Sequence, residues 1–305
     1  MLHMTVGIFG NNEPAQALLK KLGKAGTIND IAIYNHGSSE GVFTYVSPNS
    51  DKIQTLLQTL NMAEIPAIVI SEITAALGEQ LIAISEFGFE TGFMILDGTS
   101  REQIMPLVKD TCIEKFAIVK DGTELVEQLK KLSLKRGDSP LVQIDNYFNV
   151  KSVGTVILGI MKSGSLKKYD KVMIQPLEKE VMIKGIQSQD KDFEQTEPGM
   201  RVGLNLKGIE ADELRRGYVI GSLDKLKIFR LSLQKSRYSK EQLRENDTVF
   251  LSAGLQVAAA RVKKTGDVLE LECEQQLCYS RDTKFLVATT KQALPRIIGH
   301  ATLLE

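Results

Sequence analysis

The chain has 305 residues, and its 38 lysines and arginines are balanced by 38 aspartates and glutamates. The hydrophobic fraction of 43% is ordinary for a globular protein, and the length suffices for two or three domains, each with its own core. No apolar run reaches the ~18–20 residues of a membrane span, and no basic segment followed by an apolar one begins the chain, so we expect a cytoplasmic protein without membrane contact.

Apolar runs alternate with helical periodicities in residues 1–136. The runs expected to be strands are 5–9, 31–34, 42–46, 67–70, 93–96 and 116–119. The helical patterns lie at 15–22, 53–60, 75–87, 104–108 and 125–132. This alternation predicts a doubly wound, mostly parallel sheet, with an antiparallel hairpin at 31–46, where the connection is too short for a crossover. The segment Gly23–Thr27 is expected to end a helix and continue as a loop.

Beyond the linker at 134–140, which combines charge, Gly and Pro, the pattern changes. Residues 139–222 contain short apolar alternations broken about every eight to twelve residues by Gly, Asp or Pro. That rhythm is typical of a small closed β-barrel rather than of a strand–helix repeat. Residues 226–305 alternate similarly and are expected to form a second barrel, with a β-sandwich as the alternative.

Four motifs of the middle segment resemble a known family. They are GTVILG at Gly154–Gly159, SGSLKKYDKV at Ser163–Val172, PGMRVGLNLKGI at Pro198–Ile209 and LRRGYVI at Leu214–Ile220. In this order they resemble the second domain of the translational GTPases, such as elongation factor Tu and, most of all, the archaeal type of selenocysteine-specific elongation factor. The last segment resembles, more loosely, the third domain of these proteins. The resemblance implies a G-domain-like α/β domain at 1–136 followed by two small β-barrels at 139–222 and 226–305.

The nucleotide-binding pattern of such a G domain is degenerate here. A loop of the form GxxxxGK[ST] needs glycines so that backbone N–H groups can surround the phosphates, a lysine to reach them and a hydroxyl for magnesium. After the first expected strand only the first glycine, Gly10, remains. Ala15 replaces the second glycine, Gln16 the lysine and Ala17 the hydroxyl, which predicts that this segment lacks the contacts for phosphate and magnesium.

The other nucleotide motifs that the resemblance leads us to expect are also lost. The Asp-x-Pro-Gly-His motif is replaced by Val46–Ser50, Asn-Lys-x-Asp by Asp97–Ser100 and the Ser-Ala motif by Val119–Gly122. The segment Gly23–Asn29 is too short to serve as a first switch region. Because phosphoryl transfer depends on the charges that these motifs place, we expect no GTPase activity and neither GTP nor magnesium as a cofactor.

The resemblance further implies that the two barrels bind the aminoacylated end and the acceptor arm of tRNA. Such a surface needs cations along the backbone and a cavity for the terminal adenine. Met200 stands where family members usually have an acidic residue beside that adenine, and Val153 where several have arginine, so the ligand of this pocket stays open. The candidate RNA-binding residues are Met200, Arg201, Lys207, Arg215, Arg216, Arg237, Arg261 and Lys263, with Lys240 and Lys264 nearby.

The distribution of charge suits an RNA partner without requiring one. Residues 1–138 carry 12 basic and 17 acidic side chains, whereas residues 226–305 carry 13 basic and 9 acidic ones. For any single lysine or arginine, a solvated surface is the alternative reading. Three cysteines and three scattered histidines predict neither a disulfide framework nor a metal site.

The sequence therefore predicts an elongation factor-like protein without GTPase activity that binds tRNA or ribosomal RNA through its two barrels. A translation factor or a ribosomal protein is a further candidate partner, and DNA is not. Two alternatives remain open. One is a GTP-binding elongation factor with a non-standard nucleotide loop, and the other is a regulator of translation that acts through protein interactions.

Overall fold

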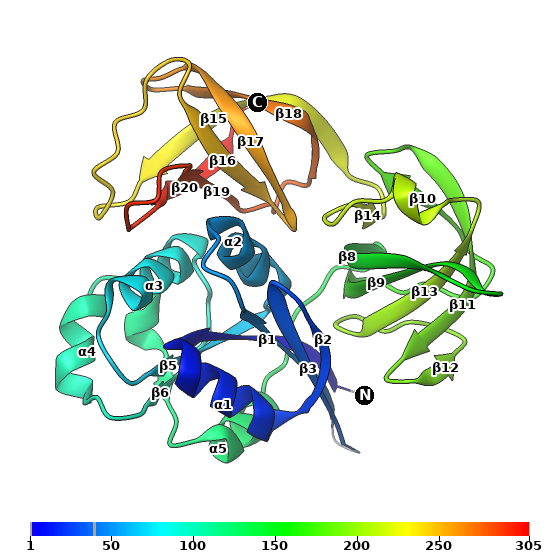
Figure 1. Cartoon of the computed structure of the whole chain (residues 1–305), viewed down its shortest axis with the longest axis horizontal. Coiled ribbons are helices and arrows are strands. Elements are labelled where there is room, and N and C mark those ends of the chain that lie inside the picture. The colour runs from blue at the N-terminus through cyan, green and yellow to red at the C-terminus, as the bar shows by residue number, and fades with distance from the viewer. Residues whose placement is uncertain (1, 39–40, 305) are drawn as a thin grey trace.

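The computed structural model describes residues 2–38 and 41–304 (Figure 1). Three folded units follow one another along the chain, and we call them the N-terminal domain, the middle barrel and the C-terminal barrel. Among the described helices, none is both long and apolar enough to cross a bilayer. The predicted fold class, a doubly wound α/β domain followed by two small β-barrels, is confirmed.

The N-terminal domain is built on a seven-stranded sheet in the order β2-β3-β4-β1-β5-β6-β7. The five strands from β4 to β7 in this order are parallel, whereas β3 runs antiparallel to β4 and β2 antiparallel to β3. The strands are β1 (Leu2–Gly10), β2 (Lys24–Ile28), β3 (Ile31–Gly37), β4 (Gly41–Pro48), β5 (Ile65–Ile70), β6 (Phe93–Leu96) and β7 (Ala117–Ile118).

Helices cover both faces of this sheet. Along β5, Ala67 and Val69 face α1 and α5, whereas Ile68 and Ile70 face α2, α3 and α4, as the two-residue period of a strand requires. A strand buried on both sides reads as a continuous apolar run, which β5 is. The helices are α1 (Asn12–Leu22), α2 (Ile53–Met62), α3 (Ala75–Phe87), α4 (Arg101–Val108) and α5 (Gly122–Leu129), with a 3-10 turn, η1, at Cys112–Lys115.

The prediction of a loop at Gly23–Thr27 is wrong. This segment enters β2, the edge strand of the sheet, and pairs with β3 through Lys24 opposite Asn35 and Ala25 opposite Tyr34. Its side chains are mostly exposed, so it carries no apolar alternation that could have marked it as a strand. The strand instead depends on backbone hydrogen bonds to β3, which local sequence does not display.

The middle barrel closes on itself. Its strands follow the order β10-β14-β8-β9-β13-β11, and an additional pairing of β10 with β11 completes the ring, while β12 extends it beside β11. Its apolar side chains, from Val142 to Ile220, fill the interior. The strands are β8 (Leu141–Val150), β9 (Gly154–Ser163), β10 (Lys171–Gln175), β11 (Lys179–Ser188), β12 (Lys191–Phe193), β13 (Arg201–Lys207) and β14 (Val219–Ile220), with a 3-10 turn, η2, at Ala211–Glu213.

The C-terminal unit is also a closed barrel, in the order β15-β18-β17-β16-β19-β20, rather than the alternative sandwich. It packs on the α2–α3 side of the N-terminal domain, where Leu286, Ala288 and Ile297 join the core beneath these helices (Figure 1). The strands are β15 (Asp224–Lys235), β16 (Thr248–Ala253), β17 (Gln256–Lys264), β18 (Leu269–Tyr279), β19 (Phe285–Thr289) and β20 (Ile297–Leu303).

Candidate functional site

The connection between β1 and α1 is a single-residue turn. β1 ends at Gly10 and α1 begins at Asn12, so Asn11 alone lies between them. The residues at the expected second glycine, lysine and hydroxyl positions therefore lie within the helix: they are Ala15, Gln16 and Ala17. Ala15 is buried against the sheet and Ala17 is exposed, and Gln16 is half-buried, with an Nε2 atom that has no hydrogen-bond partner among the described residues.

The polar groups of this turn bind within the domain. Gln80 of α3 accepts a hydrogen bond from the Gly10 N–H at 2.8 Å and donates to the Gly10 carbonyl at 3.1 Å. The Asn11 side chain accepts from the Ser71 and Glu72 N–H groups at 2.8 and 3.1 Å. Gly10 has a φ of 115°, and a Cβ there would lie 1.9 Å from the Val69 carbonyl oxygen. The glycine is thus needed for the close approach of β1 to β5.

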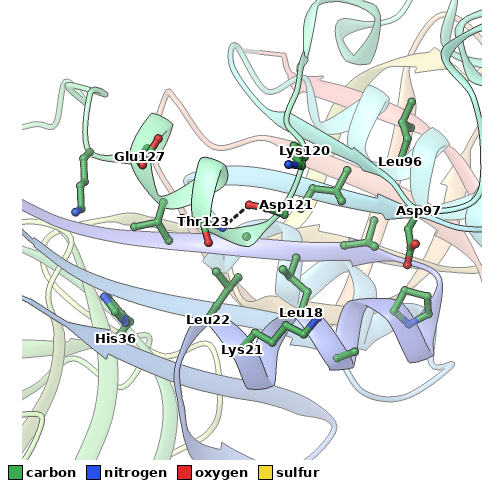
Figure 2. A pocket seen from close by; sticks show the side chains of 17 residues that line it. Leu18, Lys21, Leu22, His36, Leu96, Asp97, Lys120, Asp121, Thr123 and Glu127 are labelled. Carbon is green, nitrogen blue, oxygen red and sulfur yellow. Dashed lines mark hydrogen bonds between the residues drawn. The ribbon is translucent and has the colours of Figure 1, made fainter.

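A cleft of ≈ 700 Å³ lies between α1 and α5 at the carboxyl ends of β6 and β7 (Figure 2). Leu18 and Leu22 lie on its α1 side, and Asp97 and Lys120 follow β6 and β7. The Asp121 carboxylate accepts from the Thr123 and Glu124 N–H groups and so caps α5. The cleft therefore combines apolar walls with charges of both signs, including Lys21 and Glu127.

A second cleft, of ≈ 510 Å³, lies between the N-terminal domain and the C-terminal barrel. The end of β4 and the loop from β4 to α2, together residues 47–52, line it with Gly10, Gln80 and Arg296, so that all of the predicted motif segment Val46–Ser50 except Val46 lies on this cleft. This loop is held by the Asn49 N–H, which donates to the Asp30 carbonyl at 2.7 Å, and by Arg296 Nη1, which donates to the Asp51 carbonyl at 2.8 Å. The loop is thus bound by the chain's own groups.

Two RNA-binding candidates of the middle barrel are buried or nearly buried. Met200 is 1% exposed and lies in the barrel core, a position that does not fit the expected contact with a base. The guanidinium of Arg201 pairs with the Asp145 carboxylate through both terminal nitrogens, with Nη2 2.9 Å from Oδ1, and both side chains are nearly buried. An arginine paired in this bidentate way has few donors left for phosphate.

Arg216 connects two domains. Its Nη1 and Nη2 atoms lie 2.6 and 2.9 Å from the two carboxylate oxygens of Asp30, in the turn from β2 to β3. Its Nη1 also donates to Gln58 Oε1 at 3.2 Å, and its Nε to the Asp145 carbonyl at 3.1 Å. The hydrogen bonds from Arg216, more than its charge, hold the pKa of Asp30 below its usual value despite partial burial. The geometry assigns Arg216 to domain packing.

The remaining candidates lie on separate surfaces. Arg215 donates to backbone carbonyls of its own segment, and Arg237 donates to the Lys109 carbonyl and lies over the Tyr238 ring. Lys263 lies 3.1 Å from Glu272, and the same glutamate stands opposite Arg261 in the strand register, so acids interrupt this basic strand. Lys207 is exposed at the end of β13. The eight candidates thus form no single basic track.

Sequence reasoning missed an exposed apolar surface beside Lys207. Phe148 stands opposite Val156, which stands opposite Asn205, and this row crosses the outer face of β8, β9 and β13. Phe148 is 39% exposed and Val153 in the adjoining hairpin turn is 41% exposed, whereas the Asn205 Oδ1 atom is buried, without a hydrogen-bond partner among the described residues. An aromatic residue on the solvent side of a strand alternation was the signal that could have found it.

Comparison with known proteins agrees with the geometry of the barrels. The family model described as "Elongation factor Tu domain 2" matches residues 154–221. The protein MJ0325 of Methanocaldococcus jannaschii, described as uncharacterized, is 32% identical over 98% of this chain and 99% of its own length. The selenocysteine-specific elongation factor of the same organism is 31% identical over 67% of this chain but only 42% of its own length.

Solved structures share the whole fold. Translation elongation factor SelB from Methanococcus maripaludis, in complex with the GTP analogue GppNHp, superimposes with a TM-score of 0.84 at 18% identity, covering 100% of this chain and 79% of that one. A bacterial selenocysteine-specific elongation factor gives 0.82 at 18% identity, covering 99% and 58%. Together with the matched motifs of the middle barrel, these similarities confirm the resemblance found in the sequence. The chain belongs to the translational GTPase superfamily and has the fold of the selenocysteine-specific elongation factors.

Proposed function

We propose that this chain is a cytoplasmic, elongation factor-like protein that binds tRNA or ribosomal RNA on its barrels and has no GTPase activity. The observation that carries the RNA proposal is the outer face of β8, β9 and β13 in the barrel that matches the elongation factors. We call it the Phe148 face, and it comprises Phe148, Val153, Val156, Asn205 and Lys207.

The chemistry of the Phe148 face suits a nucleic acid end. An exposed aromatic ring can stack on a base, which contributes about 1–3 kcal/mol per base in single-strand binding. Lys207, exposed at the end of β13, supplies a cation for phosphate. At its other end this face packs against the N-terminal domain through Ile160, so the exposed part lies beside the domain junction.

A titration across a salt series tests the RNA proposal. True phosphate contacts release counterions, so the affinity for tRNA should fall steeply as the salt concentration rises. Ribosomal RNA fragments and duplex DNA of equal length serve as comparison ligands, and we expect the DNA to bind more weakly. If tRNA does not bind at low salt, or if its affinity does not depend on the salt concentration, the proposal is rejected.

The proposed loss of GTPase activity is supported by the turn between β1 and α1. Cradling phosphates requires backbone N–H groups of a glycine-rich loop, and here the Gly10 N–H binds Gln80 while the following residues are helical. No lysine or hydroxyl stands at the expected positions, because Gln16 and Ala17 occupy them. Without these charges the transition state for phosphoryl transfer lacks its main stabilisation.

Calorimetric titration with GTP, GDP and a non-hydrolysable analogue, each with magnesium, tests this second part. We expect no stoichiometric binding. Tight binding of any of the three would instead favour the alternative of a non-standard nucleotide site, for which the ≈ 700 Å³ cleft between α1 and α5 is the candidate place. A Lys120→Ala variant, altered in that cleft, would then show whether binding occurs there.

A second candidate function, binding of a translation factor or ribosomal protein, is favoured by an apolar groove of ≈ 190 Å³ between α3 and α4. Ile73, Leu107 and Tyr238 line it and are each more than a third exposed. Exposed apolar patches of this kind commonly mark protein interaction sites. A pull-down with and without nuclease treatment separates the two functions, because partners bound through RNA are released by nuclease and partners bound directly to the protein are retained. A Leu107→Glu variant should lose only the partners that are retained after nuclease treatment.

A further inference from the structure

The Phe148 face leads toward the junction between the middle barrel and the N-terminal domain (Figure 1). Along β9, Leu158 lies between Val156 of this face and Ile160, which is buried at the junction. Leu158 stands opposite Asn146 on β8, so one further row of side chains separates Phe148 from the junction. An RNA end stacked on Phe148 would therefore place its terminal ribose close to this row, to the junction, or to Lys207 at the opposite end of β13.

The two carboxylates on the junction side are already paired. Asp145 of β8 is 6% exposed and binds both terminal nitrogens of Arg201. Asp30 of the N-terminal domain binds both terminal nitrogens of Arg216, at 2.6 and 2.9 Å. A carboxylate held in this bidentate way is neutralised by its arginine, so it offers little attraction to a second cation.

The junction itself has no room for an amino acid. Thr27 and Asn29 of the N-terminal domain line it together with Asn146 and Arg216 of the middle barrel, and the void among them is ≈ 10 Å³. A void of this size holds about one water molecule. A group attached to an RNA end on the Phe148 face would therefore stay on the face, because it could not enter the junction.

Cations flank the other end of the face. Lys207 is exposed at the end of β13, and Lys151 is exposed in the turn that follows β8. Neither lysine makes an ion pair within the part of the chain that the structure describes. The next acid along the chain from Lys207, Glu210, accepts from the Glu213 N–H and so caps the turn η2. This end of the face attracts a phosphate and repels an ammonium group.

We propose that the Phe148 face binds the free 3′ end of a deacylated tRNA and excludes an aminoacylated one, an inference that rests on the RNA binding proposed above. A free α-amino group titrates at about pH 8, so an esterified amino acid is largely cationic at neutral pH. On this face it would meet unpaired lysines at one end and neutralised carboxylates at the other. A free terminal ribose carries only hydroxyl groups, which need no counter-charge. An unpaired charge is one means by which a binding site rejects the wrong ligand.

Binding of one tRNA in two forms tests this inference. One form has a free 3′ end, and the other carries an amino acid through a 3′-amide bond, which resists hydrolysis. At about pH 7 the full chain should bind the aminoacyl form at least roughly tenfold more weakly, the cost of leaving one charged hydrogen bond unmade. Equal or tighter binding of the aminoacyl form would overturn the inference and leave the proposed RNA function standing. If neither form binds, the inference fails, and the titration with ribosomal RNA decides whether the RNA function fails with it.

Asn146→Asp supplies the missing carboxylate. The substitution adds a negative charge in the row between Phe148 and the junction, and it keeps the side-chain size and the acceptor for the Tyr147 N–H. We expect the aminoacyl form to bind roughly threefold tighter than it does to the wild type, as for an exposed ion pair, and the free 3′ end to bind no tighter.

Gln128→Glu on α5 is the matched control, because it adds the same charge away from both barrels, and it should leave the ratio of the two affinities unchanged. Circular dichroism checks that both variants are folded. If the ratio does not narrow in folded Asn146→Asp, or if it narrows equally in Gln128→Glu, the lack of an available carboxylate on this face is not what rejects the amino acid, and the inference is overturned.

Discussion

Arg296 of the C-terminal barrel donates through Nε and Nη2 to the two carboxylate oxygens of Glu79 on α3, at 3.0 and 2.5 Å. Its backbone N–H also donates to Glu79 Oε1, at 2.7 Å. The side chains are 11% and 4% exposed, so this ion pair is buried between the barrel and the N-terminal domain. This buried ion pair fixes the position of the C-terminal barrel on α3, because separating Arg296 from Glu79 would leave each charge buried without its partner.

Replacing Glu79 by glutamine should therefore destabilise the protein strongly. Arg296 would keep its charge in a nearly dry site without a counter-charge, and removal of one partner of a buried pair costs about 3–5 kcal/mol. Urea unfolding followed by circular dichroism measures the loss. Glu241→Gln is the matched control, since its partner Lys291 is 67% exposed and such a pair contributes about 0–1 kcal/mol. Equal losses in the two variants would contradict the assigned role of the buried pair.

His3 gives the junction with the middle barrel a pH dependence. Burial lowers the pKa of His3, and the nearby Arg136 lowers it further, whereas Glu197, 3.5 Å from Nε2, acts in the opposite direction. Below about pH 6.5, the usual histidine pKa, the unfolded chain takes up the proton and the folded protein resists it. The contribution of His3 to stability is therefore complete above about pH 6.5 and declines as the pH falls below it.

Unfolding experiments between about pH 5 and 8 check this sign. The free energy of unfolding of the wild type should fall toward pH 5. The free energy of unfolding of His3→Gln should fall less over the same range. The free energy of unfolding of Glu197→Gln should fall more than that of the wild type, because the substitution removes a negative charge that favours protonated His3. Parallel curves for wild type and His3→Gln would show that this histidine does not control the acid sensitivity.

The elements of the N-terminal domain could be predicted where the signals are local. Residues 75–87 form α3 as predicted, because Thr74 caps the first turn by accepting from the Leu77 N–H and Gly88 ends the helix with a φ of 70°. The β-barrel rhythm of the middle segment likewise depends on neighbouring residues. β2 was missed because a polar edge strand leaves no apolar period to detect.

The partners of the arginines could not be predicted. Arg216 pairs with a residue 186 positions away and Arg296 with one 217 positions away, in other domains. A lysine or arginine in sequence looks the same whether it binds a phosphate or a buried carboxylate. The sequence therefore groups Arg201 and Arg216 with Lys207 as RNA candidates. Only the folded structure separates them, because Arg201 pairs with Asp145 of the same barrel and Arg216 with Asp30 of the N-terminal domain.

Gly10 is needed for packing in this chain, and its replacement tests that conclusion. Gly10→Ala would place a Cβ 1.9 Å from the Val69 carbonyl oxygen at a φ of 115°, so we expect a loss of at least about 2 kcal/mol in unfolding free energy. Gly78→Ala is the control: the added Cβ has no neighbour within 4 Å in helix α3, and it should stabilise by about 0.5–1 kcal/mol. A neutral Gly10→Ala would mean that the turn can rearrange.

Two variants of the Phe148 face separate stacking from phosphate contact. Phe148→Ala should weaken tRNA binding by about 1–3 kcal/mol at every salt concentration, because stacking involves no counterion release. Lys207→Ala should weaken binding and also reduce the slope of log affinity against log salt by about one. Tyr169→Ala removes another aromatic of the same barrel, 71% exposed and outside this face, and should leave both quantities unchanged. If Tyr169→Ala weakens binding as much as Phe148→Ala does, the RNA surface lies elsewhere on the barrel.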